Sequence, residues 1–178
     1  MSSRESRWTP RARALMHGVV VAAMLAAGCG GPAEDELSST SDAVKGKVKK
    51  KVTADIQNGT LIVNGTNEPD SIALRLSPGD PTTLEIVDGH SGKLAFKRDK
   101  FDHIVVSGGG SDDLLVIDET ESIFTDTEIT TLDGEDGDDE LIGGSGSEVL
   151  VGGVGNDQVD GKRGDDVALL GPGDDTFE

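Results

Sequence analysis

The hydrophobic and polar positions in the C-terminal part of the chain repeat every nine residues. Residues 134–178 divide into five successive units, which read GEDGDDELI, GGSGSEVLV, GGVGNDQVD, GKRGDDVAL and LGPGDDTFE. In every unit the fourth place is glycine, the sixth is acidic and the eighth is apolar. A composition merely rich in Gly and Asp does not keep three chemical constraints in phase. The pattern therefore predicts a structural repeat.

The hydrophobic phase continues towards the N-terminus, although the glycines become irregular. Residues 107–115 (SGGGSDDLL) fit the frame, with Gly110 at the fourth place and Asp112 at the sixth. Residues 116–133 have lost the turn glycines, so we expect coils without metal-binding turns there. Counting back in nines predicts inward-facing residues at the following eighth places: Leu132, Ile123, Leu114, Val105, Phe96 and Val87.

Between residues 54 and 106 the pattern changes to short strands. The runs TLIVNG, SIALRL, TLEIVDG, KLAF and HIVV are alternating or β-branched, and NG, PGDP and DGHSG between them are turn sequences. We expect no helix of any length. The prediction is an irregular, partly antiparallel β region over 54–106 that leads into a roll over 107–178, with regular repeats in 134–178.

The N-terminus has the features of an export signal. Residues 1–28 contain four arginines followed by a short apolar run, too short for the roughly 20 residues that span a bilayer. The stretch LAAGC resembles the lipobox of bacterial lipoproteins, which implies lipidation at Cys29. An ordinary signal peptide with an incidental cysteine is the alternative. Residues 29–53, which include KGKVKKK, then form a tether, and the protein is exported, either membrane-anchored (outer membrane or cell surface) or extracellular.

Charge narrows the possible partners. The formal net charge is −18, and removal of residues 1–28 leaves 12 basic and 33 acidic residues, a charge of −21. Self-repulsion on this scale opposes folding unless cations bind. We expect no nucleic-acid partner, because a phosphate backbone binds to a basic surface and this chain is strongly acidic. The lipid membrane is a partner through the N-terminal anchor only.

The chemistry of the repeat points to a hard cation. Its glycines permit tight turns with inward-pointing carbonyls, and the sixth place adds a carboxylate oxygen. Oxygen-only ligands of relaxed geometry suit Ca²⁺ rather than Zn²⁺ or Mg²⁺. An EF-hand does not fit the spacing, and a disordered acidic tail has no need of an apolar residue in every unit. The candidate ligands are the sixth-place acids Asp139, Glu148, Asp157, Asp166, Asp175 and Asp112.

These units resemble the RTX, or hemolysin-type, calcium-binding repeat, and GGVGNDQVD matches it completely. The resemblance implies an all-β fold, a right-handed parallel β-roll in which two nonapeptides make one coil. Residues 18 apart would then be neighbours. Calcium would lie between stacked turns, at up to about three sites. One side would carry Asp139, Asp157 and Asp175, and the other Glu148 and Asp166.

Catalysis is not expected. The chain contains neither G-x-S-x-G nor H-E-x-x-H, and the doublet Asp112–Asp113 is more simply a ligand beside a solvated acid. The sequence therefore predicts an exported protein whose repeats fold around Ca²⁺. The alternative is a surface adhesion or assembly module in which calcium is only stabilising and the open C-terminal end of the roll contacts another chain.

Overall fold

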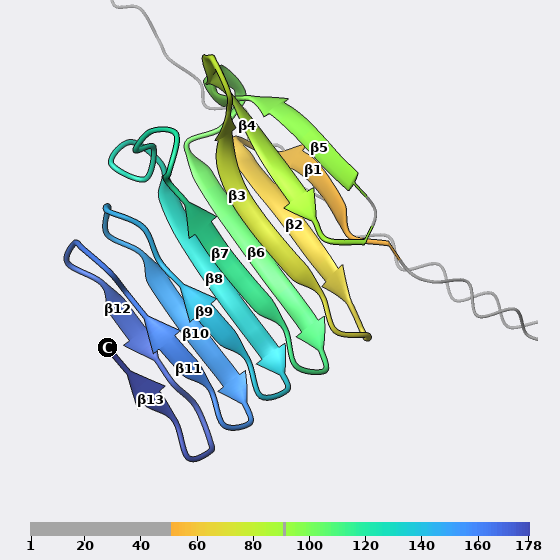
Figure 1. Cartoon of the computed structure of the whole chain (residues 1–178), viewed down its shortest axis with the longest axis vertical. Coiled ribbons are helices and arrows are strands. Elements are labelled where there is room, and N and C mark those ends of the chain that lie inside the picture. Colours follow the sequence, from red (N-terminus) through yellow and green to blue (C-terminus); the bar gives the residue numbers. More distant parts are fainter. Residues whose placement is uncertain (1–50, 91) are drawn as a thin grey trace, which may run out of the picture. The chain divides into compact units, whose positions relative to one another are not determined.

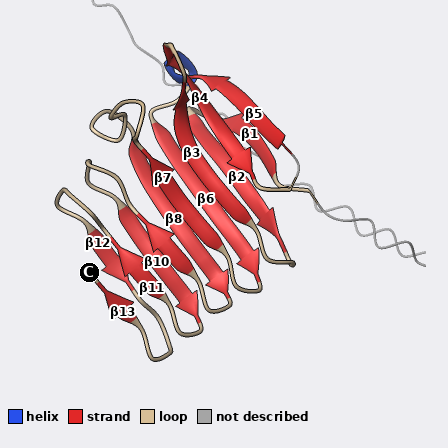
Figure 2. Cartoon of the chain, in the orientation of Figure 1, coloured by secondary structure: helices blue, strands red, loops and turns tan. Residues whose placement is uncertain are grey.

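The computed structural model describes residues 51–90 and 92–178. The predicted signal peptide, the predicted lipidation at Cys29 and most of the predicted tether lie outside the described residues. Within the described ranges the regular elements are strands and one 3-10 helix, η1 (Arg98–Lys100), as Figure 2 shows. No helix in these ranges is long and apolar enough to cross a membrane. The prediction of an all-β fold is confirmed.

The strands form two sheets, and the chain passes repeatedly from one to the other (Figure 1). The first, sheet A, contains in spatial order β1 (Thr53–Gln57), β2 (Thr60–Thr66), β6 (His103–Gly110), β8 (Ile129–Asp136), β10 (Val149–Val154) and β12 (Val167–Leu169). The second, sheet B, contains β13 (Thr176–Phe177), β11 (Gln158–Asp160), β9 (Glu140–Ile142), β7 (Leu114–Asp118), β3 (Ser71–Ser77), β4 (Asp80–Asp88) and β5 (Gly92–Lys97).

Parallel pairing stacks successive coils of the chain. Leu150 in β10 pairs with Ala168 in β12, and Leu141 in β9 pairs with Val159 in β11. Both pairs are 18 residues apart, so two nonapeptides do make one coil in the regular repeats. Alternate side chains of each strand point inward, as in β3, where Ile72, Leu74 and Leu76 are buried. The core is thus a thin layer of aliphatic side chains between the sheets.

Antiparallel strands occur where the sequence analysis expected them. β1 pairs antiparallel with β2, and β3, β4 and β5 form an antiparallel meander, so both sheets are mixed. However, β2 also pairs parallel with β6, and β3 with β7. The parallel coils therefore begin at β2 rather than at residue 107, because the segment expected to lead into the roll supplies its first coil.

Coil lengths explain why counting in nines misplaced several inward-facing residues. Leu115 pairs with Leu141 and Val106 pairs with Leu132, a separation of 26 residues. This is one residue fewer than three nonapeptides, so the count arrives at Leu114 and Val105, whose side chains are only half-buried. A shift of one residue in a strand moves a side chain to the opposite face.

Of the other early positions, Leu132 is fully buried and Phe96 packs against the core, as predicted, whereas Ile123 and Val87 were assigned incorrectly. Ile123 is 51% exposed, and its neighbour Phe124 fills the core instead. Val87 lies between the buried Ile86 and Asp88 and is itself half-buried. Phe96, on β5, packs against the core only in part. The long connections in these coils are the cause, because they are not built from nonapeptides.

Burial decreases along the regular repeats. The eighth-place residues Leu141, Leu150 and Val159 are completely buried, Ala168 is partly buried and Phe177 is 51% exposed. Each inward side chain needs a following coil to cover it, and β12 and β13 are the last strands of their sheets (Figure 1).

Candidate metal centre

The turns that lead from sheet A to sheet B carry a row of aspartates, one in each coil. We call these five residues the first row: Asp70, Asp113, Asp139, Asp157 and Asp175. Each lies at or just before the start of a sheet B strand, and in-register stacking of the strands places the turns on top of one another. The predicted alignment of Asp139, Asp157 and Asp175 is present.

A hydrogen-bond ladder holds the first row together. The backbone N–H of each aspartate donates to Oδ1 of the aspartate in the next coil. The donor–acceptor distances are 2.8 Å from Asp70 to Asp113, 2.7 Å from Asp113 to Asp139, 2.9 Å from Asp139 to Asp157 and 2.9 Å from Asp157 to Asp175. One oxygen of each accepting carboxylate is thereby fixed to the backbone.

The second oxygen of these carboxylates is left without a partner. Oδ2 of Asp113, of Asp139 and of Asp157 is buried and accepts no hydrogen bond, although the three residues are only 2–3% exposed. A buried carboxylate oxygen without a donor is costly, and native structures contain few. The three oxygens therefore mark where a cation would compensate the buried charge.

Glycine at the first place of a unit makes room for this oxygen. A Cβ on Gly134 would lie 2.2 Å from Asp139 Oδ2 and 2.4 Å from the carbonyl oxygen of Gly152. A Cβ on Gly152 would lie 2.4 Å from both Asp157 Oδ2 and the carbonyl oxygen of Leu170. Each turn thus brings a carboxylate oxygen and a carbonyl of the next coil to one small space, which is the donor set that Ca²⁺ prefers.

Asp112 does not occupy the predicted sixth place. Its side chain is exposed, and its Oδ1 accepts a hydrogen bond from the backbone N–H of Asp138, which is also exposed. Asp113 is the buried equivalent of Asp139. The error has the same origin as that at Leu114, since the 26-residue coil shifts the frame by one position.

The turns that lead from sheet B to sheet A carry the second row, Glu148 and Asp166. The backbone N–H of Glu148 donates to Asp166 Oδ1 at 2.8 Å, which repeats the ladder of the first row. Glu148 Oε2 accepts a 2.9 Å hydrogen bond from the backbone N–H of Gly144, and its buried Oε1 has no partner. The longer glutamate side chain therefore still places an oxygen in its turn.

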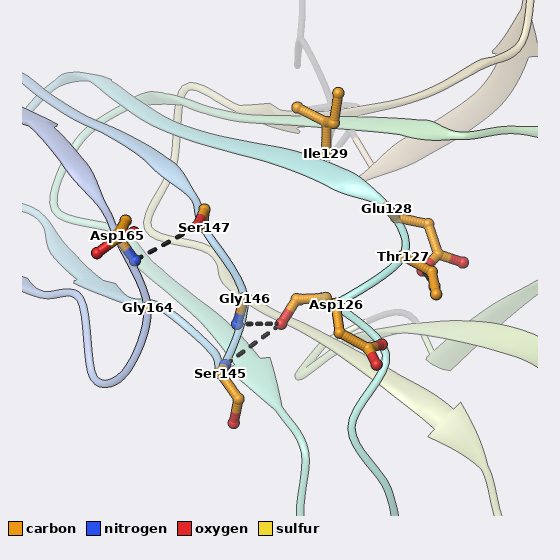
Figure 3. A pocket seen from close by; sticks show the side chains of 10 residues that line it. Asp126, Thr127, Glu128, Ile129, Ser145, Gly146, Ser147, Gly164 and Asp165 are labelled. Carbon is orange, nitrogen blue, oxygen red and sulfur yellow. Dashed lines mark hydrogen bonds between the residues drawn. The ribbon is translucent and has the colours of Figure 1, made fainter.

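Open hollows flank the second row. One, of about 600 Å³, is lined by residues 125–129, 145–147, Gly164 and Asp165. Figure 3 shows backbone nitrogens of Ser145 and Gly146 forming hydrogen bonds there, and Asp165 bonded to Ser147. Solvent therefore reaches the edge of the second-row turns.

Burial shifts the ionisation of the row carboxylates. The pKa of Asp113 is raised to about 7 and that of Asp139 to about 6, chiefly by burial and also by neighbouring negative charges, against the opposing effect of backbone hydrogen bonds. Burial also raises the pKa of Asp157 and of Glu148. Without a cation, the charged form of each carboxylate is disfavoured in the folded chain.

Sequence reasoning missed three acids that the fold brings to these turns: Asp70, Asp113 and Glu119. Asp70 and Asp113 each stand directly before an alternating strand, as Asp139 does, and this shared position is the signal that could have identified them. Asp70 also lies near Asp88 and His90, with one potential ligand atom of each within 4.8 Å of the others. There Asp88 Oδ1 accepts the His90 N–H, which is ordinary turn geometry.

Comparison with known families agrees with this geometry. The family model of the RTX calcium-binding nonapeptide repeat (4 copies) matches residues 126–159 and 142–177. No curated protein and no solved structure matches the chain. The matched residues include five predicted ligands, namely Asp139, Glu148, Asp157, Asp166 and Asp175, whereas Asp70, Asp113 and Glu119 lie outside them.

Proposed function

Residues 126–177 are RTX-type repeats, which bind Ca²⁺, and from this premise we propose that the protein is an exported calcium-binding protein whose β-roll folds around Ca²⁺. The observation that carries the proposal is the line of buried oxygens without partners, Oδ2 of Asp113, Asp139 and Asp157. The proposed sites lie between successive turns of the first row, and between Glu148 and Asp166 in the second. The coils would wind as a right-handed roll.

The proposed mechanism couples folding to binding. In the folded chain without metal, Asp139 is buried and lies near the negative charges of Asp157, Asp112 and Asp138, which disfavours its ionisation. Bound Ca²⁺ would supply the compensating positive charge to the carboxylate and carbonyl oxygens of two stacked turns. The Oδ1 ladder would hold these turns at the correct spacing while Oδ2 remains available.

A calcium titration followed by circular dichroism tests this mechanism. We expect the mature chain, from residue 29, to gain β signal as Ca²⁺ rises to about 10⁻³ M, the range of extracellular calcium modules. Mg²⁺ at the same concentration is the control, because it requires near-octahedral geometry and retains its waters. A β signal that is already complete without Ca²⁺, or that never develops, would contradict coupled folding.

Export and lipid anchoring rest on the N-terminal sequence. We propose that Cys29 is the lipidated first residue of the mature protein, because LAAGC follows a basic and then apolar segment. Incorporation of a labelled fatty acid into the wild type, and its loss in Cys29→Ser, would support this proposal. Equal labelling of both would exclude Cys29 as the site. We also propose a binding role rather than a catalytic one.

Self-association is a second candidate function, favoured by the apolar surface of the last described coil. Val167, Leu169 and Phe177 are each 51–55% exposed, and β12 and β13 are edge strands. A second copy of the chain would cover these side chains and the strand edges. Light scattering with and without Ca²⁺ distinguishes the candidates, since a monomer in both conditions supports simple calcium binding.

A further inference from the structure

The connection between β7 and β8 replaces a nonapeptide turn with a longer loop. The coil that contains it is 26 residues long instead of 18. Phe124, completely buried, anchors the loop in the core. Glu119, at its beginning, lies outside the residues that match the repeat family. The function of this loop is therefore not explained by the repeat pattern.

The loop forms hydrogen bonds with only one of the two carboxylate oxygens of Glu119. Its Oε1 accepts hydrogen bonds from the backbone N–H groups of Phe124 at 2.9 Å and Thr125 at 3.1 Å, and from the Thr125 hydroxyl at 2.9 Å. Its Oε2 is buried and has no hydrogen-bond partner. This is the same division between a fixed oxygen and an oxygen without a partner that characterises the first row.

Thr125 connects this loop to the turn of Glu148. Its hydroxyl oxygen accepts hydrogen bonds from the backbone N–H groups of Ser145 at 3.3 Å and Gly146 at 2.9 Å, two of the dashed lines in Figure 3. A Cβ on Gly146 would lie 2.0 Å from the Thr125 carbonyl oxygen and 2.9 Å from Glu148 Oε1. The Thr125 carbonyl and Glu148 Oε1 therefore border the same small space.

Glu148 supplies further evidence that a ligand belongs there. It is 1% exposed, and its Oε1 has no hydrogen-bond partner. Glu119 is linked to the turn of Glu148 through Thr125, whose hydroxyl donates to Glu119 Oε1 and accepts the backbone N–H of Gly146. Among residues 51–90 and 92–178, no lysine or arginine forms an ion pair with either glutamate. The buried Glu148 carboxylate and the buried Oε2 of Glu119 thus belong to neighbouring turns and have no lysine or arginine partner among the described residues.

We propose that Glu119 and Glu148 bind a Ca²⁺ ion between the β7–β8 loop and the turn of residues 143–148, at a site that is not formed by two nonapeptides. The Thr125 carbonyl would be a further ligand. Carboxylate and carbonyl oxygens without nitrogen or sulfur donors suit Ca²⁺. Hollows lined by Thr125 on one side and by Glu119 on the other give the ion access from solvent.

The site would make the loop part of the calcium-dependent structure. It would join the irregular coil of β7 and β8 to the first regular coil, so calcium binding would stabilise residues that lack the repeat motif. The inference rests on the proposed function of Glu148 as a calcium ligand, and the experiment must therefore separate the two claims.

Calcium stoichiometry of matched variants in the mature chain, measured by equilibrium dialysis and metal analysis, tests the proposal. Glu119→Gln keeps an oxygen acceptor for Phe124 and Thr125 but removes the charge. We expect it to bind one Ca²⁺ fewer than the wild type, or to bind that ion about tenfold more weakly. Glu121→Gln, an exposed change in the same loop, should bind the wild-type number.

Asp157→Asn separates this site from the first row. It should lower calcium binding in the first row and leave the ion at Glu119 in place. A variant with both Glu119→Gln and Asp157→Asn should therefore lose as much calcium binding as the two single variants together. If Glu119→Gln binds the wild-type number with wild-type affinity while Asp157→Asn does not, the loop site is wrong and the proposed function stands. If the wild type binds no Ca²⁺, both fail.

A thermal melt shows whether a loss of calcium binding results from a folding defect. The calcium-induced rise in Tm should be smaller for Glu119→Gln than for Glu121→Gln. The calcium-free Tm of Glu119→Gln should be at or below that of the wild type. Although burial raises the pKa of Glu119, the hydrogen bonds from the loop lower it below its ordinary value, so the fold favours the charged form that the variant lacks. A calcium-free Tm that falls while the calcium-induced rise is unchanged would show a purely structural role for Glu119 and overturn the proposal.

Discussion

The backbone N–H of Asp139 donates a 2.9 Å hydrogen bond to Oδ1 of Asp157, one coil further along the roll. The residues are 18 apart in sequence, yet this bond fixes the direction of the Asp157 carboxylate and leaves its Oδ2 buried without a partner. The same atom pair recurs between Asp157 and Asp175. Asp157 therefore has a stacked aspartate on each side.

Asp139 is flanked in the same way by Asp113 and Asp157, so Asp139 and Asp157 should matter most to calcium affinity among the predicted ligands. Asp157→Ala should weaken calcium binding at least tenfold, because it removes both the ligand oxygen and the acceptor for the Asp139 N–H. Isothermal titration calorimetry would measure the change. Asp165→Asn, an exposed charge removal in the other set of turns, is the control and should change affinity less than twofold. Equal affinities for both variants would argue against stacked sites.

The raised carboxyl pKa values predict the pH dependence of the calcium-free chain. Asp113 and Asp139 have folded pKa values of about 7 and 6, above the usual 3.8. Between pH 3.8 and these raised pKa values, the folded state binds more protons than the unfolded state. The contribution of the two carboxyl groups to stability is therefore complete below about pH 4 and is lost as pH rises through 6–7. We expect more β signal at pH 5 than at pH 8 without calcium.

Calcium should reverse this dependence, because it binds the deprotonated carboxylates and competes with protons. In millimolar Ca²⁺ the β signal at pH 8 should equal or exceed that at pH 5. Circular dichroism in calcium-depleted and calcium-containing buffers provides both measurements. A calcium-free chain that is equally folded at pH 5 and pH 8 would show that these buried carboxyls do not control folding.

Fourth-place glycines predict a steric limit on the stacking of turns. Gly155 has a φ of 145°, and a Cβ there would lie 1.9 Å from the carbonyl oxygen of Gly137 in the preceding coil. Gly155→Ala should destabilise the calcium-bound roll by about 3 kcal/mol, from backbone strain plus displacement of a turn. Gly79→Ala is the matched control, with a φ of 76° but no atom within 4 Å of the added Cβ. Urea denaturation compares the two; equal losses would mean that only backbone strain is involved.

Because burial decreases along the repeats, removing eighth-place side chains should lower the free energy of unfolding by unequal amounts. Leu141 is completely buried, so Leu141→Ala should cost about 2–5 kcal/mol in the free energy of unfolding. Phe177 is 51% exposed, and Phe177→Ala should cost about 1 kcal/mol or less in a monomer. Denaturant melts in calcium measure both. A large loss for Phe177→Ala would instead indicate that another molecule covers this side chain.

Glu135, at the second place of its unit, is a position where a substitution should stabilise the roll. Glu135 has a φ of 72°, a left-handed conformation in which L residues other than glycine are strained. Glu135→Gly should stabilise the roll by up to about 1 kcal/mol, since it relieves this strain and removes one negative charge near Asp133. Glu140→Gln, a charge removal on an ordinary strand position, controls for the electrostatic part. A destabilised Glu135→Gly would mean that the entropy of glycine outweighs the strain.

The sequence by itself determined the repeating part of this protein. Within residues 134–178 the coil length, the inward positions Leu141, Leu150 and Val159, and the alignment of Asp139 with Asp157 and Asp175 follow from a constant period. Such a period can be read from short stretches of sequence, because each unit repeats the turn residues of the previous one. The resemblance to calcium-binding repeats could be recognised for the same reason.

Only the tertiary structure decided the rest. The 26-residue coil made Asp113 and Leu115, rather than Asp112 and Leu114, the partners of Asp139 and Leu141. It also placed Thr125, which is hydrogen-bonded to Glu119, against the turn of Glu148. Register across a long connection is set by which side chains the neighbouring coil can bury, and a count along the chain contains no information about that choice.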